Sequence, residues 1–280
     1  MEVFKTIKSL QQSLERLNQN KTVGLVPTMG ALHEGHLSII DKAKNENDIV
    51  IASIFVNPTQ FDKKEDLIHY PSTLESDLEA LEKRGCDFVF TPTIEEIYQG
   101  NTVAESFDFK GLDKEMEGKF RTGHFNGVAT IVKKLFMITS PNKAYFGEKD
   151  FQQLQIIKQM VKTEGLTVNI IPVEIYREID GLAMSSRNTR LNEEQRKAAP
   201  EIYQTLLKGK KLFQQGDLEK VKSFVKNELI QNKELDLEYF EIADNENLKP
   251  ATELDPTVSY RAFIAVFAGD IRLIDNIALN

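Results

Sequence analysis

The stretch TVGLVPTMGALHEGHLSII, residues 22–40, decides the fold that this sequence predicts. It opens with a short apolar run that reaches Pro27. Proline cannot donate to a sheet ladder, so the run predicts a buried strand that ends there. A glycine-containing turn follows, and beyond it Leu37, Ile40 and Ala43 recur at the spacing of one helical face. The stretch therefore predicts a strand, a turn and a helix in succession.

Apolar strands alternating with helices continue downstream. The run DIVIASIFVN, residues 48–57, is almost wholly apolar, as expected for a parallel strand covered on both faces. Residues 4–17 predict an N-terminal helix with Phe4 on its apolar face. This alternation predicts a Rossmann-like α/β fold, a doubly wound and mostly parallel sheet. Further strands are predicted in CDFVFTP, KAYFGEKD and TVNIIPVEI, and further helices in YPSTLESDLEALEKRG, GVATIVKKLFMIT and FQQLQIIKQMV.

The pattern of elements changes after about residue 189. Two helical stretches, residues 193–216 and 218–231, precede two strand-like runs, residues 234–244 and 260–276. Helices followed by strands are typical of an α+β arrangement. The sequence therefore predicts a smaller C-terminal α+β domain after the first domain.

The charge balance and the single cysteine exclude several classes of protein. A formal net charge of -8 argues against general binding to nucleic acid or to anionic membranes, which requires basic surface. No apolar run approaches the ~18 residues of a membrane span, and the N-terminus lacks a signal-peptide pattern, so a cytoplasmic protein is predicted. Cys86 excludes an internal disulfide and is expected to be a buried, inert thiol.

The two histidines of HEGH leave three alternatives. Gly30 and Gly35 have the spacing of P-loop glycines, but His36 and Leu37 stand in place of the P-loop lysine and hydroxyl residue. A helix N-terminus still attracts phosphate, and His33 and His36 would project from it. A zinc site is the second alternative, although HEGH is shorter than the H-E-x-x-H motif and has no evident third ligand nearby. A plain capping or surface role is the third.

Amide side chains follow the next strand. In IFVNPTQF, residues 54–61, Asn57 and Gln60 come directly after an apolar run. Ligands of open α/β sheets bind beyond the carboxyl ends of the strands, so these amides could bind a polar ligand without bringing charge. The alternative is a simple Asn-Pro turn.

Charged and hydroxyl residues occupy further junctions. In YFGEKDFQQLQ, Lys149 could reach a phosphate, Asp150 could cap a helix or hold a ribose, and Gln153 lies on the first turn of that helix; a charged surface turn is the alternative. DGLAMSSRN, residues 180–188, has the composition of a mobile loop that clamps anions. GKFRTGHFNGV, residues 118–128, is a weaker lid candidate. An ATP-like ligand across the top of the sheet would explain these signals together.

These motifs carry a resemblance to a known family. HEGH after an apolar strand resembles the HxGH signature of the nucleotidylyltransferase superfamily, and MSSRN resembles its second phosphate loop. More specifically, VPTMGALHEGH, IFVNPTQF, RTGHFNGV, YFGEKDFQQL and DGLAMSSRN, in this order, resemble the pantothenate synthetase family. The resemblance covers residues 22–199 and resumes at RLIDN, residues 272–276. We expect a nucleotide- and pantoate-binding domain over residues 1–188 and a C-terminal lid domain over residues 189–280.

The resemblance implies an activity. Members of this family are ATP-dependent ligases that join pantoate to β-alanine through a pantoyl adenylate, releasing AMP and pyrophosphate, in pantothenate and coenzyme A biosynthesis. It also implies ATP as a substrate, Mg²⁺ as a cofactor and a homodimer. Thr122 stands where the family often has proline, which concerns the rigidity of the lid. The alternatives are a nucleotidylyltransferase acting on another small-molecule acceptor and an ATP-binding regulatory protein.

The resemblance also implies roles for individual residues. Asp77 is implied as a magnesium ligand, with an exposed helix carboxylate as the alternative. The implied catalytic residues are His33, His36, Lys149, Ser185, Ser186 and Arg187. The implied ATP-binding residues are Pro27, Thr28, Met29, Gly30, His33, Gly35, His36, Gly147, Lys149, Asp150, Tyr176, Met184, Ser185, Ser186 and Arg187. Pantoate or β-alanine would contact Gln60, Gln153, Asn57 and Met29, with Phe61 as a further wall.

Overall fold

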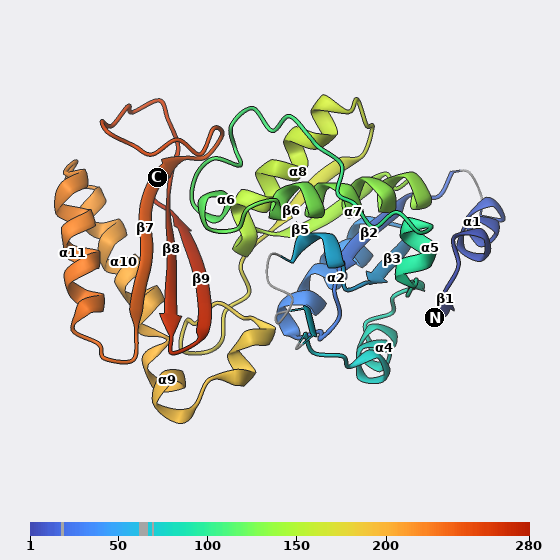
Figure 1. Ribbon diagram of the computed structural model, residues 1–280, viewed down its shortest axis with the longest axis horizontal. Helices are drawn as coiled ribbons and strands as arrows, with labels where there is room; N and C mark the ends of the chain where they lie inside the picture. Colours follow the sequence, from blue (N-terminus) through green and yellow to red (C-terminus); the bar gives the residue numbers. More distant parts are fainter. Residues whose placement is uncertain (18–19, 62–66, 69) are drawn as a thin grey trace. The chain divides into compact units, whose positions relative to one another are not determined.

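The protein comprises two compact units in a computed structural model that describes residues 1–17, 20–61, 67–68 and 70–280 (Figure 1). The first, here called the sheet unit, consists of Met1–Asp113, Glu117–Glu148 and Gln153–Glu174. The second, the C-terminal unit, consists of Lys114–Met116, Lys149–Gln152 and Ile175–Asn280. The predicted domain boundary between residues 188 and 189 stays a prediction.

The sheet unit is built on six parallel strands, which confirms the predicted α/β class. Their order is β1-β4-β3-β2-β5-β6, so β2 lies between β3 and β5. The chain builds the sheet outward from β2 in one direction and then resumes on its other side, which places the topological switch point between β2 and β5. The strands are β1 (Glu2–Phe4), β2 (Val23–Thr28), β3 (Ile49–Ile54), β4 (Phe88–Phe90), β5 (Lys143–Gly147) and β6 (Asn169–Val173).

The helices of this unit follow the predicted alternation. α2 buries Leu37, Ile40 and Ala43, as its spacing predicts, and packs against β2, β3 and β5. Cys86 is buried in the same core, as predicted, and burial raises the pKa of its thiol to about 11. The helices are α1 (Ile7–Glu15), α2 (Glu34–Glu46), α4 (Leu74–Lys83), α5 (Ile94–Tyr98), α6 (Glu117–Phe120), α7 (His124–Thr139) and α8 (Phe151–Thr163), with short 3₁₀ turns η1 (Pro58–Gln60) and η2 (Glu148–Asp150).

Two local predictions about this unit were wrong. Phe4 does not begin a helix: it ends β1 and pairs with Phe90 of β4, and Thr6 caps the helix that follows. The strand β2 does not stop at Pro27 but continues to Thr28. Pro27 is tolerated because the register with β5 comprises only Gly24 and Leu25, whereas the register with β3 runs on to the end of the strand.

The C-terminal unit has the predicted α+β composition. Its antiparallel strands β7 (Asp236–Asp244), β8 (Tyr260–Ala268) and β9 (Ile271–Ala278) share an apolar core with α10 (Glu201–Phe213) and α11 (Leu218–Ile230). The predicted helix over residues 193–216 is two helices, because Pro200 ends α9 (Glu193–Ala198) and starts α10. The 3₁₀ turn η3 (Ser186–Arg190) precedes α9.

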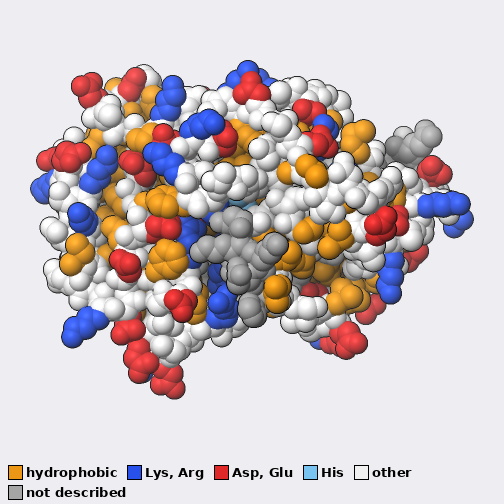
Figure 2. Space-filling model, in the orientation of Figure 1, with side chains coloured by type: hydrophobic (Ala, Val, Ile, Leu, Met, Phe, Trp, Pro, Cys, Tyr) orange, Lys and Arg blue, Asp and Glu red, His pale blue; other side chains and the backbone are white. Residues whose placement is uncertain are grey.

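The surface mixes both signs of charge. Acidic and basic side chains are interspersed across the face seen in Figure 2. Within the described part of the chain, none of the helices combines the length and the hydropathy that a membrane span requires.

Candidate active site

The turn after β2 has a left-handed backbone at two successive residues. Gly30 has a φ of 82° and Ala31 a φ of 51°. The hydroxyl of Thr28 donates to the Ser53 carbonyl at 2.7 Å and accepts from the Gly30 N–H at 3.2 Å. A positive φ is costly for alanine, so this turn persists only because its surroundings hold it.

Asp77 of α4 holds that turn. Its two carboxylate oxygens accept the Ala31 N–H at 2.9 Å and the Leu32 N–H at 2.8 Å, and the Thr73 hydroxyl donates to it at 3.1 Å. The side chain is only 3% exposed, so the alternative of an exposed helix carboxylate is wrong. The sequence held a signal for this burial, because Asp77 shares a helical stripe with Leu78 and Leu81.

The predicted magnesium role of Asp77 stays a prediction. Its two oxygens accept two backbone N–H groups and one hydroxyl, which gives the side chain a structural role in this turn. Across the described ranges, no group of three or more His, Cys, Asp or Glu side chains is placed to hold a metal ion. The zinc alternative for HEGH therefore gains no support from the described residues.

We predict that Asp77→Asn lowers the melting temperature by roughly 3–10 °C. The substituted amide turns a donor toward one of the two N–H groups, and a buried donor left without an acceptor costs about 1–3 kcal/mol. Asp236→Asn, which removes the same charge at an exposed position of β7, is the control and should leave the melting temperature within about 1 °C. Equal melting temperatures for the two variants would contradict the role of Asp77 in holding this turn.

His33 and His36 cap α2 reciprocally. Nδ1 of His33 accepts the Gly35 N–H at 3.1 Å, and Nδ1 of His36 accepts the His33 N–H at 3.4 Å. The two rings lie 4.0 Å apart between centroids and are tilted by 30°. Because each Nδ1 accepts a hydrogen bond in this geometry, Nε2 is the nitrogen of each ring that can donate to a ligand. The predicted capping role is present, and it orients a donor on each ring.

Met29 and Gln60 meet at the carboxyl ends of β2 and β3. The Gln60 amide nitrogen lies 3.0 Å from the Met29 sulfur, and its oxygen accepts from the Asn57 amide at 3.1 Å. The Gln60 carbonyl also lies 2.8 Å from Nδ1 of His124, the first residue of α7. Three of the residues predicted to bind pantoate or β-alanine are thus brought together, and Gln60 is fixed at both its side chain and its backbone.

Asn57 is a support for this group. It is 1% exposed, and its amide nitrogen also donates to the Gly127 carbonyl at 3.1 Å. Its oxygen accepts from the Tyr98 hydroxyl at 2.6 Å and the Thr59 hydroxyl at 3.2 Å. Burial raises the pKa of Tyr98, which keeps that donor protonated. Asn57 therefore positions Gln60, and its direct contact with a ligand stays a prediction.

The sheet unit contains three more predicted site residues, Gly147, Gln153 and Phe61. Gly147 is the last residue of β5, and Gln153 is half-buried on α8. Phe61 follows η1 and packs edge-on against Tyr70, with ring centroids 5.8 Å apart.

The other predicted residues belong to the C-terminal unit. Lys149 and Asp150 lie in η2, with the Lys149 ammonium 4.0 Å from the Asp150 carboxylate. Ser185 caps η3 by accepting the Arg187 N–H at 3.3 Å, so Ser185, Ser186 and Arg187 sit together at the start of one turn. Tyr176 and Met184 are joined across the base of this loop, because the Met184 N–H donates to the Tyr176 carbonyl at 3.0 Å.

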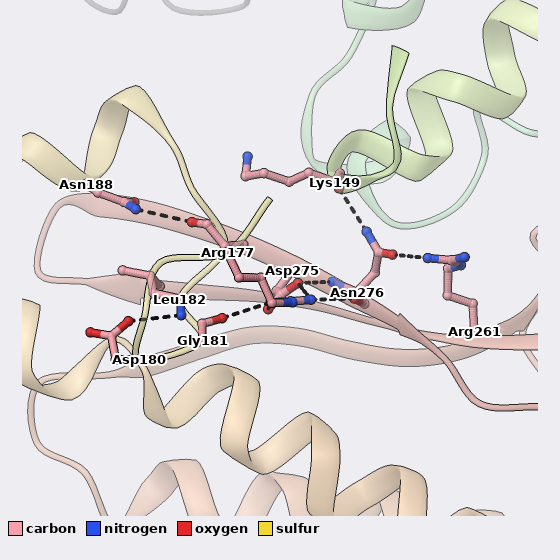
Figure 3. Close-up of polar contacts among 10 residues, drawn as sticks. Lys149, Arg177, Asp180, Gly181, Leu182, Asn188, Arg261, Asp275 and Asn276 are labelled. Carbon is pink, nitrogen blue, oxygen red and sulfur yellow. Dashed lines mark hydrogen bonds and ion pairs between the residues drawn. The ribbon is translucent and has the colours of Figure 1, made fainter. Parts of the chain in front are cut away.

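A buried ion pair stabilises the loop before η3. Arg177 binds Asp275 of β9 through two hydrogen bonds of 2.7 and 2.9 Å, and it also donates to the Gly181 carbonyl at 3.1 Å (Figure 3). Burial raises the pKa of the Asp275 carboxyl, while the charges of Arg177 and Lys149 act to lower it. Reasoning from the sequence gave Arg177 and Asp275 no role, although RLIDN already stood out as a motif.

Comparisons with known proteins agree with this architecture. The profile of the family described as "Pantoate-beta-alanine ligase" matches residues 2–278. The chain is 51% identical to a pantothenate synthetase of Christiangramia forsetii over all of both chains.

Solved structures agree as well. The fold superposes on a pantothenate synthetase from Thermus thermophilus with a TM-score of 0.92, at 39% identity over 100% of this chain and 99% of that one. A pantoate-β-alanine ligase from Francisella tularensis, solved with β,γ-ATP and β-alanine, has a TM-score of 0.83 at 36% identity, over 100% of this chain and 98% of that one. The matched motifs, the sheet order and the full-length identity agree, and the chain belongs to the pantoate–β-alanine ligase family.

Proposed function

We propose that this chain condenses pantoate with β-alanine in an ATP-dependent reaction that yields pantothenate, AMP and pyrophosphate. One observation supports this function best. The turn and helix after β2 carry two imidazole donors suited to phosphate, and the same edge of the sheet carries Gln60, a fixed and uncharged amide suited to a hydroxy acid. The uncharged amides of Gln60 and Gln153 suit a hydroxy acid better than a second phosphorylated substrate, which disfavours the alternative nucleotidylyltransferase.

In the first half-reaction a carboxylate oxygen of pantoate attacks the α-phosphorus of ATP. The bond from that phosphorus to the bridging oxygen breaks, pyrophosphate leaves, and pantoyl adenylate forms. Negative charge grows on the non-bridging and leaving oxygens. In this proposal the Nε2–H groups of His33 and His36 stabilise it, together with Lys149. One well-aimed donor contributes about 3–4 kcal/mol to such a transition state.

The remaining predicted residues are assigned to ATP and to the acceptor. Ser185, Ser186 and Arg187 would bind the phosphates through hydroxyl and guanidinium donors, as their shared turn permits. Gln60 and Gln153 would bind pantoate, with Met29 against its methyl groups. The ATP-binding roles of Pro27, Thr28, Gly30, Gly35, Gly147, Asp150, Tyr176 and Met184 stay part of the proposal.

In the second half-reaction the neutral amine of β-alanine attacks the acyl carbon of the adenylate. The acyl–oxygen bond breaks, AMP leaves with the electron pair, and the amine proton passes to solvent. We assign no side chain as the base for this step.

Magnesium enters the proposal only with the nucleotide. Mg²⁺ commonly binds through phosphate oxygens and water with one or two carboxylates at most, so it does not require a protein-built cage. The implied role of Asp77 as one of its ligands stays part of the proposal. The cytoplasmic location and the homodimer likewise remain proposals, and the dimer is tested by the sedimentation mass of the purified chain.

The test is pyrophosphate release from MgATP with pantoate alone and then with β-alanine. We expect about one equivalent per active site with pantoate alone and continuous turnover after β-alanine is added. Pantoate labelled with ¹⁸O in its carboxylate should transfer one labelled oxygen to AMP, because the attacking oxygen remains on phosphorus. Absence of pantoate-dependent release, or unlabelled AMP, would contradict the adenylate mechanism.

A further inference from the structure

The C-terminal strand β9 contacts the backbone of a residue that the proposed function makes catalytic. The side-chain amide of Asn276 donates to the carbonyl of Lys149 at 2.9 Å. Figure 3 shows this carbonyl turned toward Asn276 while the Lys149 side chain extends away from it. Lys149 lies in the short 3₁₀ turn η2. This hydrogen bond ties the Lys149 backbone to β9.

Asn276 is itself held firmly. It is 2% exposed, and its side-chain oxygen accepts from the Arg261 guanidinium at 2.5 Å. That guanidinium stacks over the ring of Phe151, 4.0 Å from its centroid. Phe151 is the first residue of α8 and follows Lys149 by two positions. The amide thus cannot rotate without breaking a charge-assisted bond, so its donor direction is fixed.

The residue before Asn276 fixes the second phosphate loop. Asp275 pairs with Arg177, which donates to the Gly181 carbonyl and stacks on Tyr203 at 3.6 Å from the ring centroid. Gly181 has a φ of 94°, and a Cβ there would lie 2.5 Å from the Tyr203 ring. This tight turn leads into the loop that carries Ser185 and Arg187.

We propose that Asn276 is a positioning residue for Lys149. Together, Asp275 and Asn276 hold Lys149 and the loop that carries Ser185 and Arg187 in positions from which both can bind one phosphate group. The inference rests on the proposed function. It explains why RLIDN stands apart from the other motifs in the sequence: two consecutive side chains of β9 each anchor a different segment. Asn276 itself contacts no reacting atom and acts through the lysine.

The expected effect follows from the precision that phosphoryl chemistry requires. A displacement of about 1 Å in a charge-stabilising group can cost about 100-fold in rate. Asn276→Asp keeps the size of the side chain and offers Arg261 a carboxylate, but it turns an acceptor toward the Lys149 carbonyl. We expect kcat for pantoate- and β-alanine-dependent pyrophosphate release to fall about 10- to 100-fold, with KM for ATP and pantoate within about threefold.

Two comparisons separate this role from a structural one. Asn276→Ser is neutral and too short to reach the Lys149 carbonyl, so it should reproduce the fall without an added charge. Asn232→Asp makes the same chemical change at another asparagine of the C-terminal unit, which bonds Glu201, and should leave kcat unchanged. Melting temperatures establish that each variant is folded.

The decisive measurement is a double-mutant cycle with Lys149→Ala. If Asn276 acts through the lysine, Asn276→Asp should change kcat less than about threefold once the lysine side chain is gone. An equal loss in both backgrounds, or an unchanged kcat in the single variants, overturns the inference. The proposed function fails separately, since in that case the unaltered protein shows no pantoate-dependent release.

Discussion

Replacing His36 with asparagine is expected to lower pantoate-dependent pyrophosphate release by about 100- to 1000-fold while leaving the fold intact. The asparagine oxygen can take the place of Nδ1 and accept the His33 N–H, so the helix cap is retained. No donor remains at the position of Nε2. Loss of one donor to developing phosphate charge corresponds to about 3–4 kcal/mol in the transition state. The assay is single-turnover release, with a melting curve for each variant.

His36→Gln is the matched control. Its amide nitrogen reaches about as far as Nε2 but leaves the Nδ1 position without an acceptor. Glutamine should therefore keep part of the activity but lower the melting temperature. Asparagine should lose the activity but keep the melting temperature. If asparagine is as active as histidine, the ring serves only as a cap and the catalytic assignment of His36 fails.

The fold could be predicted because most of its strands lie within apolar runs that are separated by strongly periodic helices. α2 illustrates this: Leu37, Ile40 and Ala43 recur at helical spacing and all are buried. The errors occur where tertiary pairing overrides local pattern. Phe4 fits the apolar stripe of a helix, yet it pairs with β4 across the edge of the sheet. A strand as short as β1 cannot produce a periodic signal.

The sequence predicts the hydrogen-bond donors of the candidate site but not the residues that hold those donors in place. HEGH, the amides after β3 and the serine loop each carry functional groups within one short segment, so the sequence reveals them. The supports join segments that are far apart in the chain. Asp77 binds the turn at Ala31, and Asn276 binds Lys149 from the last strand. No local pattern encodes such a contact before the fold is known.

A side chain at Gly127 is expected to disturb the Gln60 region strongly. A Cβ at Gly127 of α7 would lie 2.1 Å from the Thr59 carbonyl oxygen and 2.7 Å from the Gln60 Cα. Both are backbone atoms, so no rotamer change relieves the clash. Overpacking typically costs about 1–3 kcal/mol of folding free energy. To relieve this clash, η1, which carries Gln60, must move. Gly127→Ala should lower the melting temperature by roughly 5–10 °C and raise KM for pantoate about tenfold.

Gly209→Ala is the control that separates the effect of the backbone clash from the effect of helix propensity. Gly209 lies inside α10, where an added Cβ would meet Val225 at 3.4 Å, an ordinary contact with a side chain. Alanine is favoured over glycine in a helix by about 1 kcal/mol, so this variant should be neutral or more stable, with KM unchanged. Gly127→Ala gains the same propensity and must still lose stability, because the backbone of η1 occupies the space. If both variants gain stability and bind pantoate equally well, α7 does not fix the position of Gln60.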